Sequence, residues 1–134
     1  KFVDEGEYIT CHWVPSENYQ GFFHVLHGGI QATLIDEIAS WAIFSHEKTA
    51  GVTTEMQVKY RRPVRADQGE IWLWGKVTEV ARRLVTAHVE LFNEKNELAT
   101  EADVVYMIYP EELARKKLDW PGAEAFYKPV EEEE

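Results

Sequence analysis

The stretch IQATLIDEIASWAIFSHEK, residues 30–48, decides the fold of this chain. Apolar residues recur in it at helical spacing and form a stripe along one side of the expected helix. Neighbouring apolar residues widen this stripe, so that only a narrow polar strip remains. We therefore expect a long helix that is enclosed by other structure rather than lying on a surface. The stripe is built on Ile30, Leu34, Ile38 and Trp41.

The polar strip of this helix also follows helical spacing, and it contains two carboxylates, Asp36 and Glu37. An acidic side chain within an apolar helix is unfavourable unless it is paired or used for chemistry. The residues alone leave two interpretations of Asp36 open. It is either a functional carboxylate or a solvated structural anchor.

The residues after Gly51 have the two-residue period of β-strands. Apolar and polar side chains alternate over residues 52–60, as in a half-buried strand, and Pro63 ends the run. A short helix is expected over 111–118, directly after Pro110. Further strands are expected at 8–14, 70–80, 84–92 and 97–109.

This order of elements predicts an α+β fold. One strand and one long helix precede four antiparallel strands, and the sheet needs a cover for its apolar face. The helix is the only candidate, so the sheet is expected to curl around it. We expect a single domain over residues 1–134, with a core at about 8–109 and an acidic tail at about 119–134.

Composition and charge exclude several kinds of partner. The chain has 134 residues, with 14 Lys and Arg against 24 Asp and Glu and a net charge of −10. Affinity for nucleic acids depends on the positively charged side chains of a protein, so no nucleic-acid partner is expected for this acidic chain. No run reaches the ~18 apolar residues of a membrane span, and the first residues show no signal-peptide pattern. Cys11 is the only cysteine, which excludes an intrachain disulfide and favours a cytoplasmic location.

Two glycines, Gly28 and Gly29, precede the helix. Free N–H groups at a helix N-terminus carry partial positive charge, and glycine lets a ligand oxygen approach them closely. Such an end is able to polarise a carbonyl group. The two glycines are equally explained by a tight turn into the helix.

The segment YQGFFHVLHGGIQATLIDE, residues 19–37, resembles the signature of hotdog-fold acyl-CoA thioesterases, in particular their phenylacetyl-CoA-pathway and 4-hydroxybenzoyl-CoA branch. The runs GVTT at 51–54 and VKYRRPV at 58–64 are similar to that family's next strand, and the likeness covers about residues 15–109. The resemblance implies a hotdog fold, an antiparallel sheet wrapped around one long central helix. It also implies hydrolysis of an acyl-CoA without a cofactor other than the coenzyme A of the substrate. Family members form homodimers, often dimers of dimers, with active sites between protomers.

The resemblance also assigns catalytic roles to single residues. Asp36 matches the catalytic carboxylate, which acts as a nucleophile or as a general base. Gly28 matches the residue whose backbone N–H polarises the thioester carbonyl from the other protomer. His27 matches the motif histidine that shapes the turn, and Thr53 falls where some relatives place a hydroxyl that orients water.

The substrate-binding candidates include one departure from the family pattern. Many relatives carry Asn or Gln about six residues before the motif histidine, where this chain has Gly21, and Gln20 is the proposed substitute. Arginine suits the phosphates of coenzyme A, although paired arginines are often only solvated turns. The candidates are Gly29, Gln20, Glu37, Trp41, Thr54, Arg61 and Arg62.

Aromatic residues offer a further candidate pocket. Trp72 and Trp74 fall on one face of their expected strand, and we place Tyr106 near them. Together with Trp41 they are candidates for the wall of an acyl pocket. Core or interface packing explains them equally well.

Other functions stay open at this point. The first alternative is a non-catalytic acyl-thioester-binding or regulatory hotdog domain, and the second is a hydratase-type enzyme with a His–Asp pair. A metal site is not expected. The possible ligands His24, His27, Asp36 and His46 are spread along the chain, and a helix of two and a half turns separates His27 from Asp36.

Overall fold

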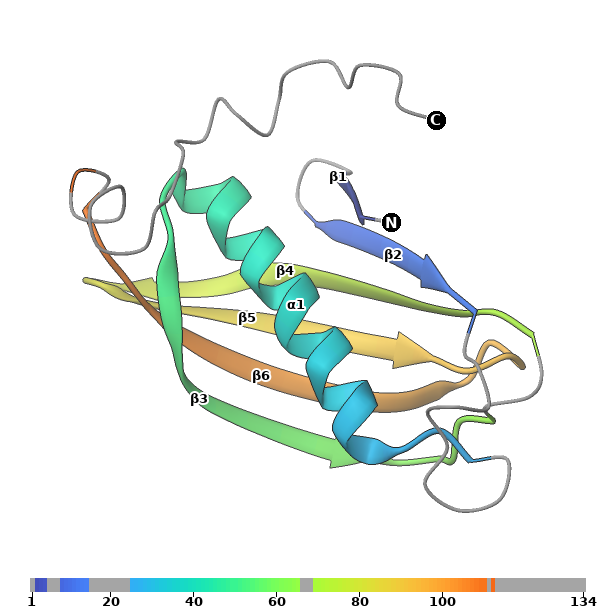
Figure 1. Cartoon of the computed structure of the whole chain (residues 1–134). Coiled ribbons are helices and arrows are strands. Elements are labelled where there is room, and N and C mark those ends of the chain that lie inside the picture. The colour runs from blue at the N-terminus through green and yellow to red at the C-terminus, as the bar shows by residue number, and fades with distance from the viewer. Residues whose placement is uncertain (1, 5–7, 15–24, 66–68, 111, 113–134) are drawn as a thin grey trace.

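The computed structural model describes residues 2–4, 8–14, 25–65, 69–110 and 112. Within them the chain forms one helix and a six-stranded sheet (Figure 1). The elements are β1 (Phe2–Asp4), β2 (Ile9–Trp13), α1 (Gly28–Glu47), β3 (Gly51–Tyr60), β4 (Ile71–Ala81), β5 (Leu84–Phe92) and β6 (Leu98–Ile108).

The long helix and the five strands predicted from the sequence are confirmed, each end to within two residues, and β1 is an addition. The expected acidic tail and nearly all of the expected helix at 111–118 lie outside the described residues, as do Gln20, Gly21 and His24. No helix of the described part of the chain is long and apolar enough to span a membrane.

The strands follow the order β1-β2-β4-β5-β6-β3, and every neighbouring pair is antiparallel. Strands β4, β5 and β6 are consecutive in the chain, whereas β3 lies beside β6 at the edge. The helix α1 therefore connects β2, near one edge of the sheet, to β3 at the opposite edge. Figure 1 shows the helix lying along the concave face of the sheet. The predicted α+β arrangement, with a sheet curled around one helix, is confirmed.

Both ends of α1 are capped by the residues that flank it. The His27 side chain accepts a hydrogen bond from the Gly29 N–H over 2.8 Å, and extended backbone at His27 starts the helix. At the other end Lys48 adopts the left-handed conformation, with φ 58°, and its N–H bonds the Phe44 carbonyl. Gly51 then opens β3 so close to β6 that a Cβ atom there would lie 2.2 Å from the Met107 carbonyl oxygen.

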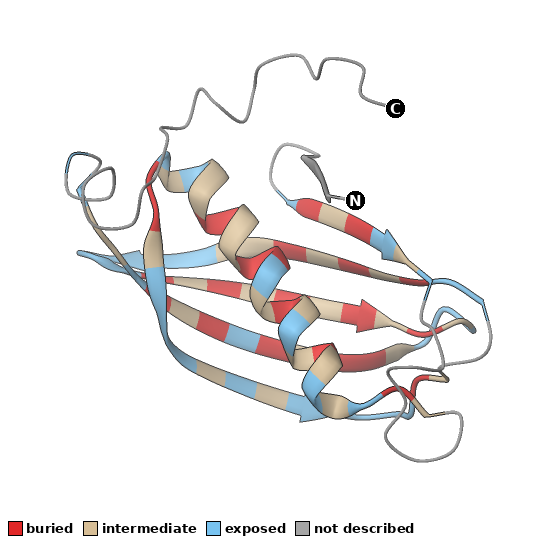
Figure 2. Cartoon of the chain, in the orientation of Figure 1, coloured by how far each residue is buried: buried red, intermediate tan, exposed pale blue. Residues whose placement is uncertain are grey.

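The core lies between α1 and the concave face of the sheet. On β5 the side chains alternate, and those facing the helix are fully buried (Figure 2). Gln31 fixes the first turn of α1 to the sheet, because its amide oxygen accepts from Thr100 on β6 and its amide N–H donates to the Leu26 carbonyl. The buried side chains of α1 are Gln31, Ile35, Ile38, Ala39, Ala42 and Ile43.

The enclosure expected for the helix is only partial in the single chain. Thr33 and Glu37 are exposed on the side that faces away from the sheet. Strand β3 is also more exposed than its alternation predicts, with Val52 38% and Tyr60 52% accessible. The reason is its position, because β3 is an edge strand of ten residues and has a described neighbour on one side only.

Candidate functional site

Asp36 lies in the third turn of α1 and points at the sheet. Its Oδ1 atom accepts two hydrogen bonds, from Thr53 Oγ1 on β3 at 2.9 Å and from Tyr106 Oη on β6 at 3.2 Å. Within the described part of the chain, Oδ2 accepts no hydrogen bond. Two hydroxyls thus hold one carboxylate oxygen in place, and this fixes the orientation of the Asp36 side chain.

The two hydroxyls meet because of the register of β3 and β6. Thr53 pairs directly with Tyr106, and the next pair is Glu55 with Val105, so Thr54 is the extra residue of a β-bulge. The Thr54 hydroxyl bonds the Val105 carbonyl at 3.1 Å. This bulge directs Thr53 toward the helix and gives Thr54 a structural contact of its own.

Tyr106 has a strongly perturbed acidity. Burial raises the pKa of its phenol to about 12, and the negative charge of Asp36 adds to the rise. The phenol is therefore protonated at neutral pH and donates its hydrogen to Asp36.

The N-terminus of α1 forms a second polar feature. Tyr60 Oη donates to the Gly28 carbonyl at 2.8 Å, and the Gly29 N–H is used by the His27 cap. The next two N–H groups, of Ile30 and Gln31, bond the His27 carbonyl. Among the described residues the Gly28 N–H has no acceptor, and it carries the positive end of the helix dipole.

One chain does not bring these two features together. Gly28 and Asp36 are eight positions apart in the same helix. At about 1.5 Å per residue this separates them by about 12 Å along the helix axis. A single carbonyl group cannot contact both within one chain.

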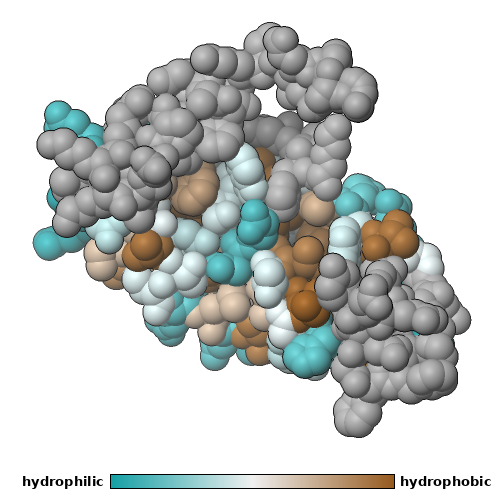
Figure 3. Space-filling view, viewed as in Figure 1, coloured by the Kyte–Doolittle hydropathy of each residue, from teal (hydrophilic) through white to brown (hydrophobic). Residues whose placement is uncertain are grey.

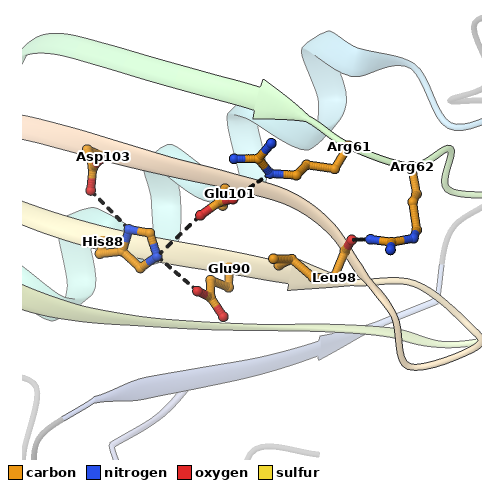
Figure 4. A network of polar contacts seen from close by, with 7 residues as sticks. All are labelled: Arg61, Arg62, His88, Glu90, Leu98, Glu101 and Asp103. Carbon is orange, nitrogen blue, oxygen red and sulfur yellow. Dashed lines mark hydrogen bonds and ion pairs between the residues drawn. The ribbon is translucent and has the colours of Figure 1, made fainter.

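Other candidate substrate-binding residues lie on the helix near Asp36 or directly after β3. Glu37 is exposed next to it, and Trp41 is half-buried about one turn further on. Arg61 and Arg62 directly follow Tyr60, the last residue of β3, whose hydroxyl bonds the Gly28 carbonyl. Arg61 Nε is paired with Glu101 at 2.6 Å, whereas the Arg62 guanidinium donates to the Leu98 carbonyl at 2.7 Å (Figure 4).

The expected neighbourhood of Tyr106 is wrong. Trp72 and Trp74 lie on the outer face of the sheet, where Trp72 stacks on Phe92 with ring centres 4.4 Å apart. Tyr106 faces the helix instead, in phase with the buried Val104. Sequence reasoning missed Tyr106 as a partner of Asp36, although its phase on the strand was a usable signal.

The surface around α1 is mixed in polarity. Figure 3 shows hydrophilic side chains in the middle of this face with hydrophobic ones next to them. Tyr60 of β3, which is 52% accessible and bonds the Gly28 carbonyl, adds an exposed aromatic side chain to this surface. A carboxylate beside apolar surface suits a substrate with a reactive carbonyl and a hydrophobic group.

Comparisons with known proteins bear on the family and the fold of this chain. Residues 23–100 match the family model described as the thioesterase superfamily. The mouse protein named acyl-coenzyme A thioesterase 13 is 30% identical over 89 residues, which cover 66% of this chain and 63% of that protein. The chain thus matches less than two thirds of that relative's length.

Solved structures share the fold. Mouse thioesterase superfamily member 2 superposes with a TM-score of 0.69 at 25% identity, over 78% of this chain and 82% of that one. A hypothetical thioesterase protein with coenzyme A from Streptococcus pneumoniae TIGR4 gives a TM-score of 0.75 at 15% identity, over 83% and 89%. At that identity the second likeness shows the fold alone. The predicted hotdog fold is confirmed.

Proposed function

The chain belongs to the thioesterase superfamily, and from this premise we propose that it hydrolyses acyl-CoA to a free acid and coenzyme A. The observation that carries the proposal is the Asp36 carboxylate, held at Oδ1 by Thr53 and Tyr106. An oriented carboxylate with one oxygen left over is suited to general-base or nucleophilic attack on a thioester. Membership of the superfamily selects the thioester among possible carbonyl substrates.

Two routes use the same Oδ2 atom. As a general base, Asp36 takes a proton from water while the water oxygen bonds to the carbonyl carbon, and collapse of the intermediate breaks the C–S bond. As a nucleophile, Oδ2 bonds to that carbon first, and water then hydrolyses the resulting anhydride. In both routes the thiolate of coenzyme A leaves and is protonated. Single turnover in ¹⁸O-water identifies the nucleophilic route when water attacks the aspartyl carbon of the anhydride, because that attack alone places ¹⁸O in Asp36.

The active site in this proposal is shared by two chains. The Gly28 N–H of one protomer polarises the carbonyl that Asp36 of the other protomer attacks, since about 12 Å of helix separates these groups within one chain. The exposed edge of β3 supplies a surface for pairing with a second copy about a two-fold axis. A cytoplasmic homodimer, or a dimer of such dimers, is part of the proposal.

The substrate contacts follow from this placement. Tyr60 bonds Gly28, and Arg61 and Arg62 come next in the chain, so a carbonyl at Gly28 leaves the phosphates of coenzyme A within reach of them. Arg62 is the stronger candidate, because among the described residues its guanidinium contacts a carbonyl and no carboxylate. Gly29, Gln20, Glu37, Trp41 and Thr54 remain proposed substrate contacts.

The acyl group of the substrate is proposed from the resemblance to one branch of the family. We place it in the range of the phenylacetyl-CoA and 4-hydroxybenzoyl-CoA branch that residues 19–37 resemble. Support comes from Trp41, which is half-buried on the helix close to Asp36 and offers an aromatic wall.

The test is thiol release from short, medium, long and aromatic acyl-CoAs, measured with the parent chain, Asp36→Asn and Glu79→Gln. Glu79 is exposed on β4 and serves as the control carboxylate. Turnover that is lost only in Asp36→Asn supports the enzyme. Tight acyl-CoA binding without turnover of any substrate would favour the non-catalytic binding domain, and hydration of an enoyl-CoA without thiol release would favour the hydratase.

A further inference from the structure

The outer face of the sheet, opposite α1, carries a cluster of four ionisable side chains on β5 and β6 (Figure 4). They alternate with the buried residues that face the helix, so they point away from Asp36. In the strand register His88 lies opposite Asp103 and Glu90 lies opposite Glu101. Three of these side chains are partly buried, with 24% of His88, 23% of Glu90 and 21% of Glu101 accessible.

The hydrogen bonds of the His88 ring fix its orientation. Its Nδ1 atom lies 2.9 Å from Asp103 Oδ1, a distance at which Nδ1–H donates to the carboxylate. The Nε2 atom then faces Glu90 Oε2 at 3.0 Å and Glu101 Oε1 at 3.9 Å. Metal-binding histidines commonly donate their other N–H to a carboxylate in this way.

We propose that His88 Nε2, Glu90 and Glu101 bind a divalent transition-metal ion, for which zinc fits best. One ligand atom from each of the three lies within 4.8 Å of the others. Around zinc, bonds of about 2.0–2.2 Å at tetrahedral angles place ligand atoms about 3.3–3.5 Å apart. The distances of 3.0 and 3.9 Å from Nε2 to the two carboxylates bracket that value. Three protein ligands leave a fourth position to solvent.

Arg61 supports the same arrangement from the side. Its Nε bonds Glu101 Oε2 at 2.6 Å, which leaves Oε1 directed at His88. Both His88 and Glu101 therefore have outer partners that orient them, as ligands of established metal sites do.

Charge favours a cation at this point. Glu90 and Glu101 lie directly opposite each other on neighbouring strands, and like charges in such a pair are destabilising. Together with Asp103 these two carboxylates carry three negative charges, and Arg61 carries one positive charge. Two net negative charges therefore surround a neutral His88. A divalent ion balances them.

A proton is the competing occupant of Nε2. Burial lowers the pKa of His88, but hydrogen bonds to Asp103 and Glu90 and the charges of both carboxylates together raise it above the ordinary value of 6.5. Metal binding needs the unprotonated Nε2, so affinity for the ion is expected to increase from pH 6 to pH 8.

The test uses the untagged full chain, freed of metal with a chelator and titrated with zinc chloride by calorimetry at pH 7.5. The parent is expected to take up one equivalent that His88→Gln and Glu90→Gln lose. Asp103→Asn is expected to bind about 10–100-fold more weakly, because it removes only the partner of Nδ1. His12→Gln is the matched control, since His12 also lies beside a carboxylate, Glu70 at 3.4 Å, on the same sheet.

Two further readouts accompany the titration. Cobalt(II) bound in place of zinc is expected to show visible absorption bands in the parent and in His12→Gln, but not in His88→Gln. Zinc is expected to raise the melting temperature of the same two proteins only. No uptake by the parent at pH 7.5, or equal uptake by the parent and His88→Gln, overturns the proposal and leaves a protonated ion-pair network.

Discussion

Tyr106 donates a hydrogen bond to the Asp36 carboxylate over 3.2 Å, although seventy positions separate the two residues in the chain. The bond joins the middle of the helix to the last strand of the sheet. It links the proposed catalytic carboxylate to a residue that the sequence did not identify as its partner.

Replacing Tyr106 with Phe is expected to lower kcat about 10–100-fold with little change in KM. A hydrogen bond to a charged group contributes about 1.5–3 kcal/mol. Without the Tyr106 hydroxyl, the Asp36 carboxylate loses one of the two hydrogen bonds that orient it. Phe fills the same buried position, so circular dichroism and melting temperature serve as the fold control. An unchanged kcat in a well-folded variant would remove Tyr106 from the positioning role.

The acidity of Tyr106 predicts a specific dependence on alkaline pH. The folded-state pKa of about 12 exceeds the ordinary 10.0, so the folded protein holds this proton more tightly than the unfolded chain. The free energy of unfolding is therefore expected to decrease as pH increases from 10 towards 12. Absorbance at 295 nm should show a late-titrating component in the parent that Tyr106→Phe lacks. Titration of all tyrosines near pH 10 in the folded parent would contradict this.

Gly28→Pro is expected to lower kcat about 10²–10³-fold, because it removes a backbone N–H proposed to polarise the carbonyl. Proline suits the first position of a helix, and the extended backbone of His27, with ψ 135°, is compatible with a following proline. Gly28→Ala is the matched control. It keeps the N–H and places a Cβ 3.3 Å from the Tyr60 ring. Equal losses in both variants would point to crowding at Tyr60 instead.

Mixing the two defects tests whether one site uses two chains. Chains carrying Asp36→Asn and chains carrying Gly28→Pro, unfolded and refolded together, should form mixed dimers with one intact site each. Half of the dimers are then mixed, and about a quarter of the parent activity is expected to return. No recovery, with mixed dimers demonstrated by mass spectrometry, would mean that each chain uses its own Gly28 and Asp36 or neither.

Gly51→Ala is expected to destabilise the chain by about 1–3 kcal/mol or more, because overpacking forces the backbone to move. The added Cβ would lie 2.2 Å from the Met107 carbonyl oxygen, an atom of the rigid strand β6. Gly75→Ala provides the comparison, since its Cβ would meet the Val89 side chain at 3.2 Å. Urea unfolding measures both, and an equal loss in the two variants would show that β6 yields to the added carbon.

The long helix and the strands were predicted correctly from the sequence where the apolar residues follow a periodic pattern. The apolar stripe of residues 30–48 and the alternation after Gly51 each specify an element from neighbours in the chain. The helix starts at Gly28, two residues earlier than expected, because His27 is its N-cap and accepts a hydrogen bond from the Gly29 N–H. The half-buried pattern expected for β3 failed at Tyr60 because β3 is an edge strand. It failed at Val52 because the bulge at Thr54 pairs Val52 with the exposed Met107 instead of a helix-facing residue.

The sequence by itself determined the helix, the strands and Asp36 as the residue to examine, because hydrophobic period and a carboxylate within an apolar helix are local properties. Only the tertiary structure decided what surrounds that carboxylate. Thr53 and Tyr106 reach it through a register between β3 and β6 that includes a bulge at Thr54, and His88 meets Glu101 through the register of β5 and β6. Register depends on backbone pairing between segments far apart in the chain, and a one-residue slip would turn each of these side chains to the other face of the sheet.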